Sequence, residues 1–193
     1  MGPASQRGFT LLEVLVAILI LSFGVLGVLG LQALALQANK EARYQSTAVR
    51  LARELGELMR GNKDIAITAN NPYLVSNYTG TLPSYTANCF TAACASKTEV
   101  AQFQIRDWLS RVSSQGEGLP GARVVVCIDS TPYSSAGLPV WACSNTGDSV
   151  VVKIGWTHPT TNRADASASA ILDLASSSSS RPSVIVPLIA GRS

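Results

Sequence analysis

Eighteen uncharged residues near the N-terminus, Val14 to Leu31, constrain this chain more than any other feature of its sequence. At ~1.5 Å of rise per residue, a helix of this length approaches the ~30 Å apolar thickness of a bilayer. Ser22 is the only polar side chain in the run. A helix that is apolar on every face is rare in the core of a small domain. The run therefore predicts a membrane-spanning helix rather than a helix buried in a soluble core.

The charged residues separate this segment from the rest of the chain. Of 193 residues, 47% are hydrophobic and only 14% are charged, against about a quarter charged in ordinary domains. Residues 1–38 contain just two charged side chains, Arg7 and Glu13. The remainder is a polar body of one-domain size, and this length excludes a multidomain enzyme or a multi-span transporter. The net charge of +3, without a basic run, gives no indication of nucleic-acid binding.

The flanks of the apolar run predict its orientation. A secretory signal peptide has a shorter apolar core and a small-residue cleavage site, whereas here the segment runs on through residues 31–42 into more helix-forming sequence. Cleavage after the apolar core is therefore not expected. Arg7 and the terminal amino group favour a cytoplasmic N-terminus and an exported body, although Lys40 and Arg43 oppose this preference on the far side.

Glu13 stands at the mouth of the apolar run and does not fit a plain anchor. A carboxylate at the edge of a membrane span is costly if it stays unpaired, which makes it a candidate functional residue. Taken alone, it has a second interpretation, in which it simply marks the membrane interface. The residue type and position do not separate these two interpretations.

Residues 8–17, GFTLLEVLVA, resemble the class III signal of type IV prepilins. That signal has a short basic leader ending in Gly, then Phe, then a Glu that opens an apolar helix. The resemblance implies that a membrane-embedded prepilin peptidase cleaves after Gly8 and methylates the new amino group of Phe9. In a fibre of such helices, Glu13 would pair with the positive N-terminus of a neighbouring subunit. Opposite charges attract strongly in a low-dielectric core, which favours the functional interpretation of Glu13.

Two helices and a connecting segment are predicted before residue 115. The apolar stripe continues beyond the span with helical spacing, so one helix is expected from about Phe9 to Arg60. Residues 62–96 are rich in Asn, Tyr, Thr and Pro, and we interpret them as a long surface connection with room for short strands. The Ser96–Glu99 capping box opens a second helix over about 97–114.

Short β-branched runs separated by turn residues occupy the rest of the chain. They are residues 122–128, 139–143, 149–156, 170–174 and 183–189, with turns at 136–139, 145–148, 158–159 and 176–180. They predict an antiparallel sheet of four or five strands within about 122–189. The expected fold is α+β, with a long N-terminal helix packed on the sheet, as in pilins. Its expected parts are a cleaved leader (1–8), a membrane or fibre-core helix (9–38) and a periplasmic domain (39–193).

The four cysteines all lie in the predicted exported body. An even count in an oxidising compartment predicts two disulfides, for which three connectivities exist. We favour Cys89–Cys94, closing a small loop, and Cys127–Cys143, joining adjacent strands across a hairpin. The spacings fit no standard zinc site, so neither a metal nor another cofactor is expected.

The sequence gives little support for catalysis. It contains no GxSxG, phosphate-binding loop or HExxH motif. Its one histidine, His158, lies in a predicted Thr-Pro turn, so we expect no catalytic residues and no enzyme activity. Trp108, Trp141 and Trp156 are interpreted as core residues rather than as a binding platform.

Further stretches resemble the PilV family of minor pilins, known as type IV pilus modification proteins. They are the end of the first helix (LARELGELMRGN), the stretch from Trp108 to Gly121, Val126-Cys127, Trp141–Cys143 and the VVVKIGWT strand. The resemblance implies a low-copy subunit that primes pilus assembly with other minor pilins and is carried near the fibre tip, supporting adhesion and twitching motility. Its partners would be the prepilin peptidase, the other minor pilins, the major pilin, the inner membrane and, as a further candidate, a tip adhesin.

Two alternatives stay open. One is a minor pseudopilin of type II secretion, which belongs to the same superfamily. The other, of a different class, is a membrane-tethered periplasmic binding module without a role in a fibre. The expected location in the pilin interpretation is the inner membrane, with a single pass and a cytoplasmic N-terminus, and afterwards the fibre at the cell surface.

Overall fold

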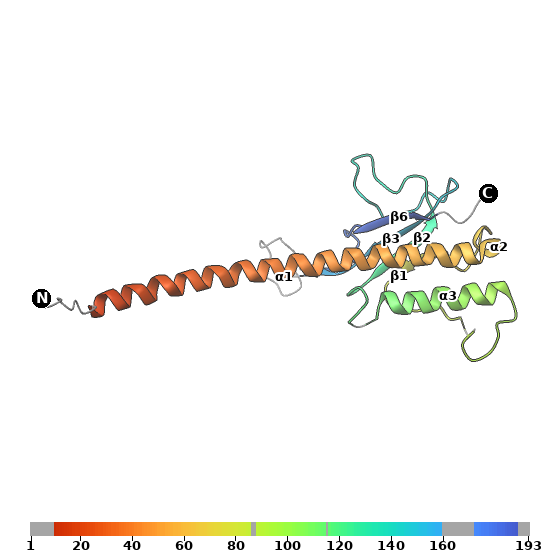
Figure 1. Ribbon diagram of the computed structural model, residues 1–193. Coiled ribbons are helices and arrows are strands. Elements are labelled where there is room, and N and C mark those ends of the chain that lie inside the picture. Colours follow the sequence, from red (N-terminus) through yellow and green to blue (C-terminus); the bar gives the residue numbers. More distant parts are fainter. Residues whose placement is uncertain (1–9, 86–87, 115, 160–171, 189–193) are drawn as a thin grey trace, which may run out of the picture. The chain divides into compact units, whose positions relative to one another are not determined.

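The computed structural model describes residues 10–85, 88–114, 116–159 and 172–188 (Figure 1). The chain forms two compact units, Met1–Ala42 and Arg43–Ser193. Helix α1, Leu11–Gly61, begins in the first unit and ends in the second.

The part of α1 in the first unit is helical without interruption from Leu11 to Ala42. Its large apolar side chains between Leu11 and Leu36 are exposed. Exposed apolar surface on this scale marks a contact with a membrane or another protein. The long helix predicted from about Phe9 to Arg60 is confirmed over the described residues.

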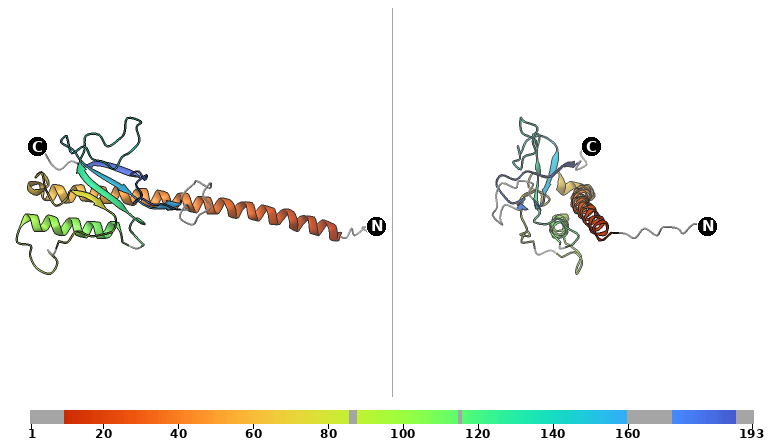
Figure 2. Two further views of the ribbon diagram at one scale, coloured as in Figure 1. Left: turned by 180° about the vertical axis from the view of Figure 1, so that it is seen from behind. Right: turned by 90° about the vertical axis from the view of Figure 1, so that its left-hand side faces the viewer.

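In the second unit, α1 presents one buried face at helical spacing. This face consists of Ala48, Leu51, Ala52, Leu55, Gly56 and Met59. Helix α3, Lys97–Val112, packs beside it, and the Trp108 Nε1–H donates to the Leu51 carbonyl at 2.9 Å (Figure 2). The predicted capping box forms: Ser96 Oγ accepts from the Glu99 amide at 3.2 Å, and Glu99 Oε2 accepts from the Ala95 amide.

Four antiparallel strands form the main sheet in the order β1-β2-β3-β6. They are β1 (Val75–Tyr78), β2 (Arg123–Ile128), β3 (Val150–Gly155) and β6 (Val184–Leu188). β2 and β3 pair in a continuous register, with Val124 opposite Ile154 and Val126 opposite Val152. The predicted α+β fold, with a long helix on an antiparallel sheet, is confirmed.

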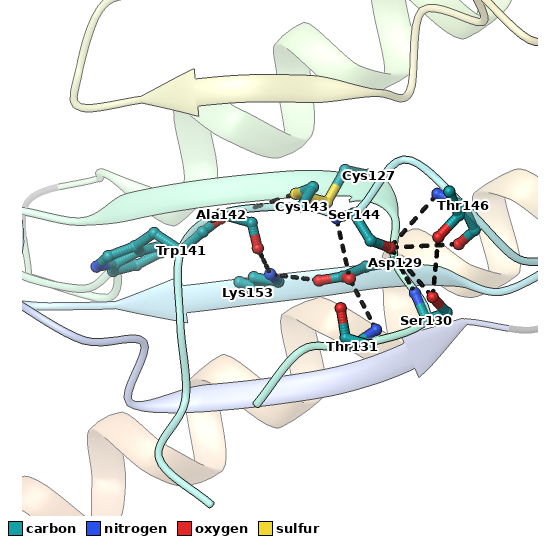
Figure 3. Close-up of a disulfide and its surroundings, with 10 residues drawn as sticks. All are labelled: Cys127, Asp129, Ser130, Thr131, Trp141, Ala142, Cys143, Ser144, Thr146 and Lys153. Carbon is teal, nitrogen blue, oxygen red and sulfur yellow. Dashed lines mark hydrogen bonds and ion pairs between the residues drawn. A yellow bond between two sulfur atoms is a disulfide. The ribbon is translucent and has the colours of Figure 1, made fainter. Parts of the chain in front are cut away.

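Different parts of the chain pack on the two faces of this sheet. One face packs on the helices and contributes Val124, Val126, Val152 and Ile154 to the core. The other face lies under the connection between β2 and β3, residues 129–149, which we call the β2–β3 loop. In Figure 3, the helices lie behind the sheet and the side chains of this loop in front of it. Every residue of β3 is buried, because both faces are covered at that strand.

Two expectations about the connecting segments are wrong. Residues 139–143 form no strand, because they cross over the sheet and their Ala142 carbonyl accepts from a lysine side chain instead of a neighbouring strand. His158-Pro159 is not a turn but the short strand β4, which pairs with β5 (Leu172–Asp173) in a separate two-stranded sheet. Of the run expected at 170–174, Leu172–Asp173 form β5, and residues 170 and 171 lie outside the described residues.

The segment 62–96 is more than a surface connection. It contains the short helix α2, Lys63–Ala66, and the edge strand β1. Tyr73 and Tyr78 from this segment are buried in the core. The Tyr78 hydroxyl donates to Ser113 Oγ at 2.7 Å, and Asn62 Nδ2 donates to the Lys97 carbonyl at 2.8 Å. The segment is therefore pinned to both ends of α3.

Candidate functional site

Helix α1 begins with a local capping arrangement at Thr10. Its Oγ1 accepts a hydrogen bond from the Glu13 amide at 3.3 Å, and its carbonyl accepts from the Glu13 and Val14 amides. Thr and Glu three residues apart form the sequence of a capping box, and a negative charge in the first turn is favoured by the helix dipole. Only the backbone amide of Glu13 bonds to Thr10, so the local effect of the Glu13 side chain is limited to the favourable position of its charge in the first turn.

The carboxylate of Glu13 is exposed. It forms no hydrogen bond or ion pair with any residue that the structure describes. A charged group next to an apolar helix is stabilised by a partner of opposite charge. Any such partner must therefore come from outside the described part of the chain. The predicted processing residues, Gly8 and Phe9, lie outside the described residues as well.

The apolar part of α1 has the properties of a membrane span. α1 is long and apolar enough to cross a bilayer, and none of the residues in its most apolar 18-residue stretch is buried. The hydroxyl of Ser22 donates to the Ile18 carbonyl at 2.7 Å, so the one polar side chain of the run is satisfied within the helix. Gly24, Gly27 and Gly30 are helical, and a methyl group added at any of them would meet no atom within 4 Å. No contact in the described chain therefore requires these glycines.

Two disulfides join the four cysteines. Cys89 is bonded to Cys94 and Cys127 to Cys143, with Cα atoms 5.2 Å and 6.4 Å apart. These are the pairs favoured from the sequence. The second bond does not join two strands across a hairpin, however, because residue 143 lies in the β2–β3 loop. It ties this loop to β2 on the outer face of the sheet (Figure 3).

A buried ion pair fixes the same loop to β3. Lys153 Nζ lies 2.5 Å from Asp129 Oδ2, and both side chains are fully buried. The ammonium group also donates to the Ala142 carbonyl, and the Thr131 and Ser144 amides donate to Asp129 Oδ1. The sequence analysis missed this pair. Its signal is a lysine within the apolar run VVVKIG, because a buried ammonium needs a carboxylate partner.

The pKa of the Asp129 carboxyl reflects two opposing effects. Burial by itself would raise the pKa, because it disfavours the charged form. The hydrogen bonds from Lys153 and from the Thr131 and Ser144 amides lower the pKa by more. The net effect is a pKa below the ordinary value for aspartate, so the carboxylate is charged at neutral pH.

Trp141 differs from the other two tryptophans. Trp108 and Trp156 are buried, as expected, but Trp141 is only half-buried, so its assignment to the core is wrong. Its ring lies against Gly155 on the outer face of the sheet, where a methyl group on that glycine would come within 3.0 Å of it. Its Nε1–H donates to Ser180 Oγ at 3.1 Å, and the Arg123 guanidinium lies 4.4 Å from the ring centre.

Among the residues that the structure describes, one group of three side chains of metal-ligand type lies close together. The ligand atoms of Cys127, Asp129 and Cys143 lie within 4.8 Å of one another. The two sulfurs share a disulfide and the carboxylate pairs with Lys153, so these atoms are committed to structural bonds. His158 lies 3.8 Å from Asp173, between β4 and β5.

These observations define a class of protein. Its first helix is exposed and apolar over the first part and amphipathic over the second, where it packs on an antiparallel sheet. Residues 3–29 match the prokaryotic N-terminal methylation motif, and residues 30–106 match the family described as Tt1218-like type IV pilin. The two matches adjoin along the chain, and both are consistent with a type IV prepilin-like pilin. No curated protein and no solved structure matches the chain.

Proposed function

We propose that this chain is a minor pilin of the PilV type, a structural subunit without enzyme activity. It primes the assembly of a type IV pilus with other minor pilins and is carried near the fibre tip, where it supports adhesion and twitching motility. Prepilin peptidase cleaves it after Gly8 and methylates Phe9. Before assembly it spans the inner membrane once with a cytoplasmic N-terminus, and its body, from about residue 39, is periplasmic.

The observation that carries this proposal is the Glu13 carboxylate. It lies in the first turn of an exposed apolar helix and has no partner in the described chain. A neighbouring subunit would supply the missing positive charge as the methylated amino group of its own Phe9. Leaving one charge of such a pair unmatched in an apolar environment costs roughly 3–5 kcal/mol. The pair therefore sets the axial position of one subunit on the next.

The helix cap at Thr10 can be separated from pairing between subunits by a set of substitutions. Glu13→Gln keeps the size of the side chain but removes the charge. Glu13→Asp keeps the charge, and Thr10→Ala removes the capping hydroxyl while leaving Glu13 in place. We expect Glu13→Gln to abolish incorporation into sheared pili, measured by immunoblot against total cell protein. Thr10→Ala should retain incorporation, and Glu13→Asp should retain part of it.

Two outcomes would contradict the pairing. Incorporation of Glu13→Gln at the native level would show that no charge is needed. Equal loss in Glu13→Gln and Thr10→Ala would indicate that both substitutions act through the stability of the first helical turn and not through pairing between subunits. A membrane-tethered binding module, the alternative of a different class, should tolerate all of these substitutions.

Processing is tested by the intact mass of the mature protein from the native host. Removal of the first eight of 193 residues leaves 185, beginning at Phe9 and carrying one methyl group. A mature chain that retains residues 1–8 would contradict the prepilin assignment itself.

Deletion of the gene separates the two fibre systems. Loss of surface pili and twitching supports a pilus subunit, whereas loss of protein secretion with intact pili supports a type II pseudopilin.

A further inference from the structure

The outer face of the sheet carries a groove of about 760 Å³. Its floor is formed by outward-facing side chains of β1 and β2, among them Ser76, Arg123 and Val125. One wall is the stretch 141–145 of the β2–β3 loop, and Ala69 and Asn70 contribute to the opposite side. Cavities of a few hundred to a thousand Å³ that combine apolar surface with a few polar groups are typical binding sites.

The wall of this groove is held in place by three separate contacts. The Cys127–Cys143 disulfide ties it to β2, and Lys153 holds it through the Asp129 carboxylate and the Ala142 carbonyl. Trp141 lies on Gly155, which leaves room for the ring because it has no side chain. Figure 3 shows Asp129, Trp141 and Cys143 along this one loop, with the disulfide and the ion pair joining it to the sheet. A site held in this way loses little conformational freedom when a ligand binds.

Arg123 is the one charged residue among the described residues that line the groove. Its Nε–H donates to Asn77 Oδ1 at 2.9 Å, Nη1 lies 3.5 Å from the Ser177 carbonyl, and the guanidinium lies on the Trp141 ring. All of these partners are neutral. Within the part of the chain that the structure describes, no carboxylate pairs with Arg123. Burial lowers the pKa of its guanidinium, as expected for a cation that has lost water without gaining an anion.

We propose that this groove binds a carboxylate-bearing peptide segment of another protein. Arg123 would receive the carboxylate, because its planar guanidinium suits a two-point contact with two oxygens. Val125 and the disulfide offer an apolar floor to an aliphatic side chain. The amides of Asn70 and Asn145 can both donate to and accept from the peptide main chain. An acidic saccharide would match Arg123 but would place hydroxyl groups on the apolar floor, so the observations favour a peptide.

This binding does not depend on fibre assembly, so it can succeed or fail separately from the proposed function. We would titrate the mature chain in detergent with acetylated tripeptides that carry two aliphatic residues and a C-terminal glutamate, using calorimetry. The matched probe is the same peptide with both carboxyl groups converted to amides, and glucuronate serves as the saccharide probe. Arg123→Gln is the test variant, and Arg53→Gln, an exposed arginine of α1, is the control.

We expect the acidic peptide to bind at least tenfold more tightly than its amide. Arg123→Gln should weaken binding of the acidic peptide at least tenfold, and Arg53→Gln should leave it unchanged. Three results would overturn the proposal: no binding of any acidic peptide to the wild type, equal binding by Arg123→Gln, or glucuronate binding as tightly as the peptide. If Arg123→Gln does not fold, the comparison of peptide and amide on the wild type still decides the role of the carboxylate.

Discussion

Lys153 Nζ lies 2.5 Å from Asp129 Oδ2, and no part of either side chain reaches solvent. Removing two charges from water is costly, and their attraction offsets this cost only when the remaining polar atoms are also satisfied. Here the Ala142 carbonyl and the Thr131 and Ser144 amides supply the further hydrogen bonds. The pair therefore sets the path of the β2–β3 loop across the sheet, and breaking it should lower the free energy of unfolding.

The first prediction concerns Lys153→Met. This substitution leaves the Asp129 carboxylate buried without its cation, and it should lower the free energy of unfolding by roughly 3–5 kcal/mol. The double variant Lys153→Met with Asp129→Asn should be less destabilised than Lys153→Met alone. It removes both charges, and the asparagine oxygen can still accept from the Thr131 and Ser144 amides. Urea unfolding of the mature chain in detergent measures the stability of the single and the double variant. Equal stability of Lys153→Met and wild type would contradict the structural role of the ion pair.

The second prediction concerns pH. The folded-state pKa of Asp129 lies below its unfolded value, so the unfolded chain binds the proton first as the pH falls. The stability that comes from this carboxylate is complete above the unfolded pKa of about 3.9 and is lost as the pH falls through the lower folded pKa. The difference in unfolding free energy between wild type and Asp129→Asn should therefore shrink in acid. If the difference in unfolding free energy between wild type and Asp129→Asn stays constant from neutral pH to acid, this prediction is wrong.

The sequence predicts the parts of this fold that depend on local signals. Helical spacing and the Ser96–Glu99 capping box place α1 and α3, and β-branched runs place β2, β3 and β6. The run 139–143 has the same local composition as a strand. It forms none, because a disulfide and the Lys153 ammonium hold its backbone over the sheet.

The outer face of the sheet could not be predicted in the same way. Lys153 needs a carboxylate, but its partner lies 24 residues earlier in the chain and is chosen by the register of β2 on β3. Likewise, Arg123 and Trp141 meet only because the β2–β3 loop folds back over the sheet. By contrast, the apolar run and Glu13 could be recognised from the sequence alone, because their properties belong to one continuous segment.

The third prediction compares the two disulfides. A cross-link stabilises chiefly by restricting the unfolded chain, and it does so more for a longer loop. The bond Cys127–Cys143 spans 16 residues and Cys89–Cys94 spans five. Replacing the first pair by alanines should therefore cost about 3 kcal/mol and the second about 2 kcal/mol. Denaturant unfolding of the two double variants measures this, and a larger loss for Cys89–Cys94 would contradict the order.

The last prediction concerns the contact between Trp141 and Gly155. A methyl group at Gly155 would come within 3.0–3.1 Å of two ring atoms of Trp141, which is closer than such atoms normally approach. Gly155→Ala should therefore displace the indole and the wall of the groove, at a cost of about 1–3 kcal/mol. Gly61→Ala is the matched control, since a methyl group there meets nothing within 4 Å.

The fluorescence of Trp141 provides the second measurement for this variant. Trp108 and Trp156 are buried away from the outer face of the sheet, so their emission should be unaffected. In Gly155→Ala the emission should shift to longer wavelength as Trp141 gains contact with water, and the Trp141→Phe background should show no such shift. Native stability and native emission in Gly155→Ala together would mean that the ring does not depend on this glycine for its place. The groove wall would then be held by the disulfide and the ion pair alone.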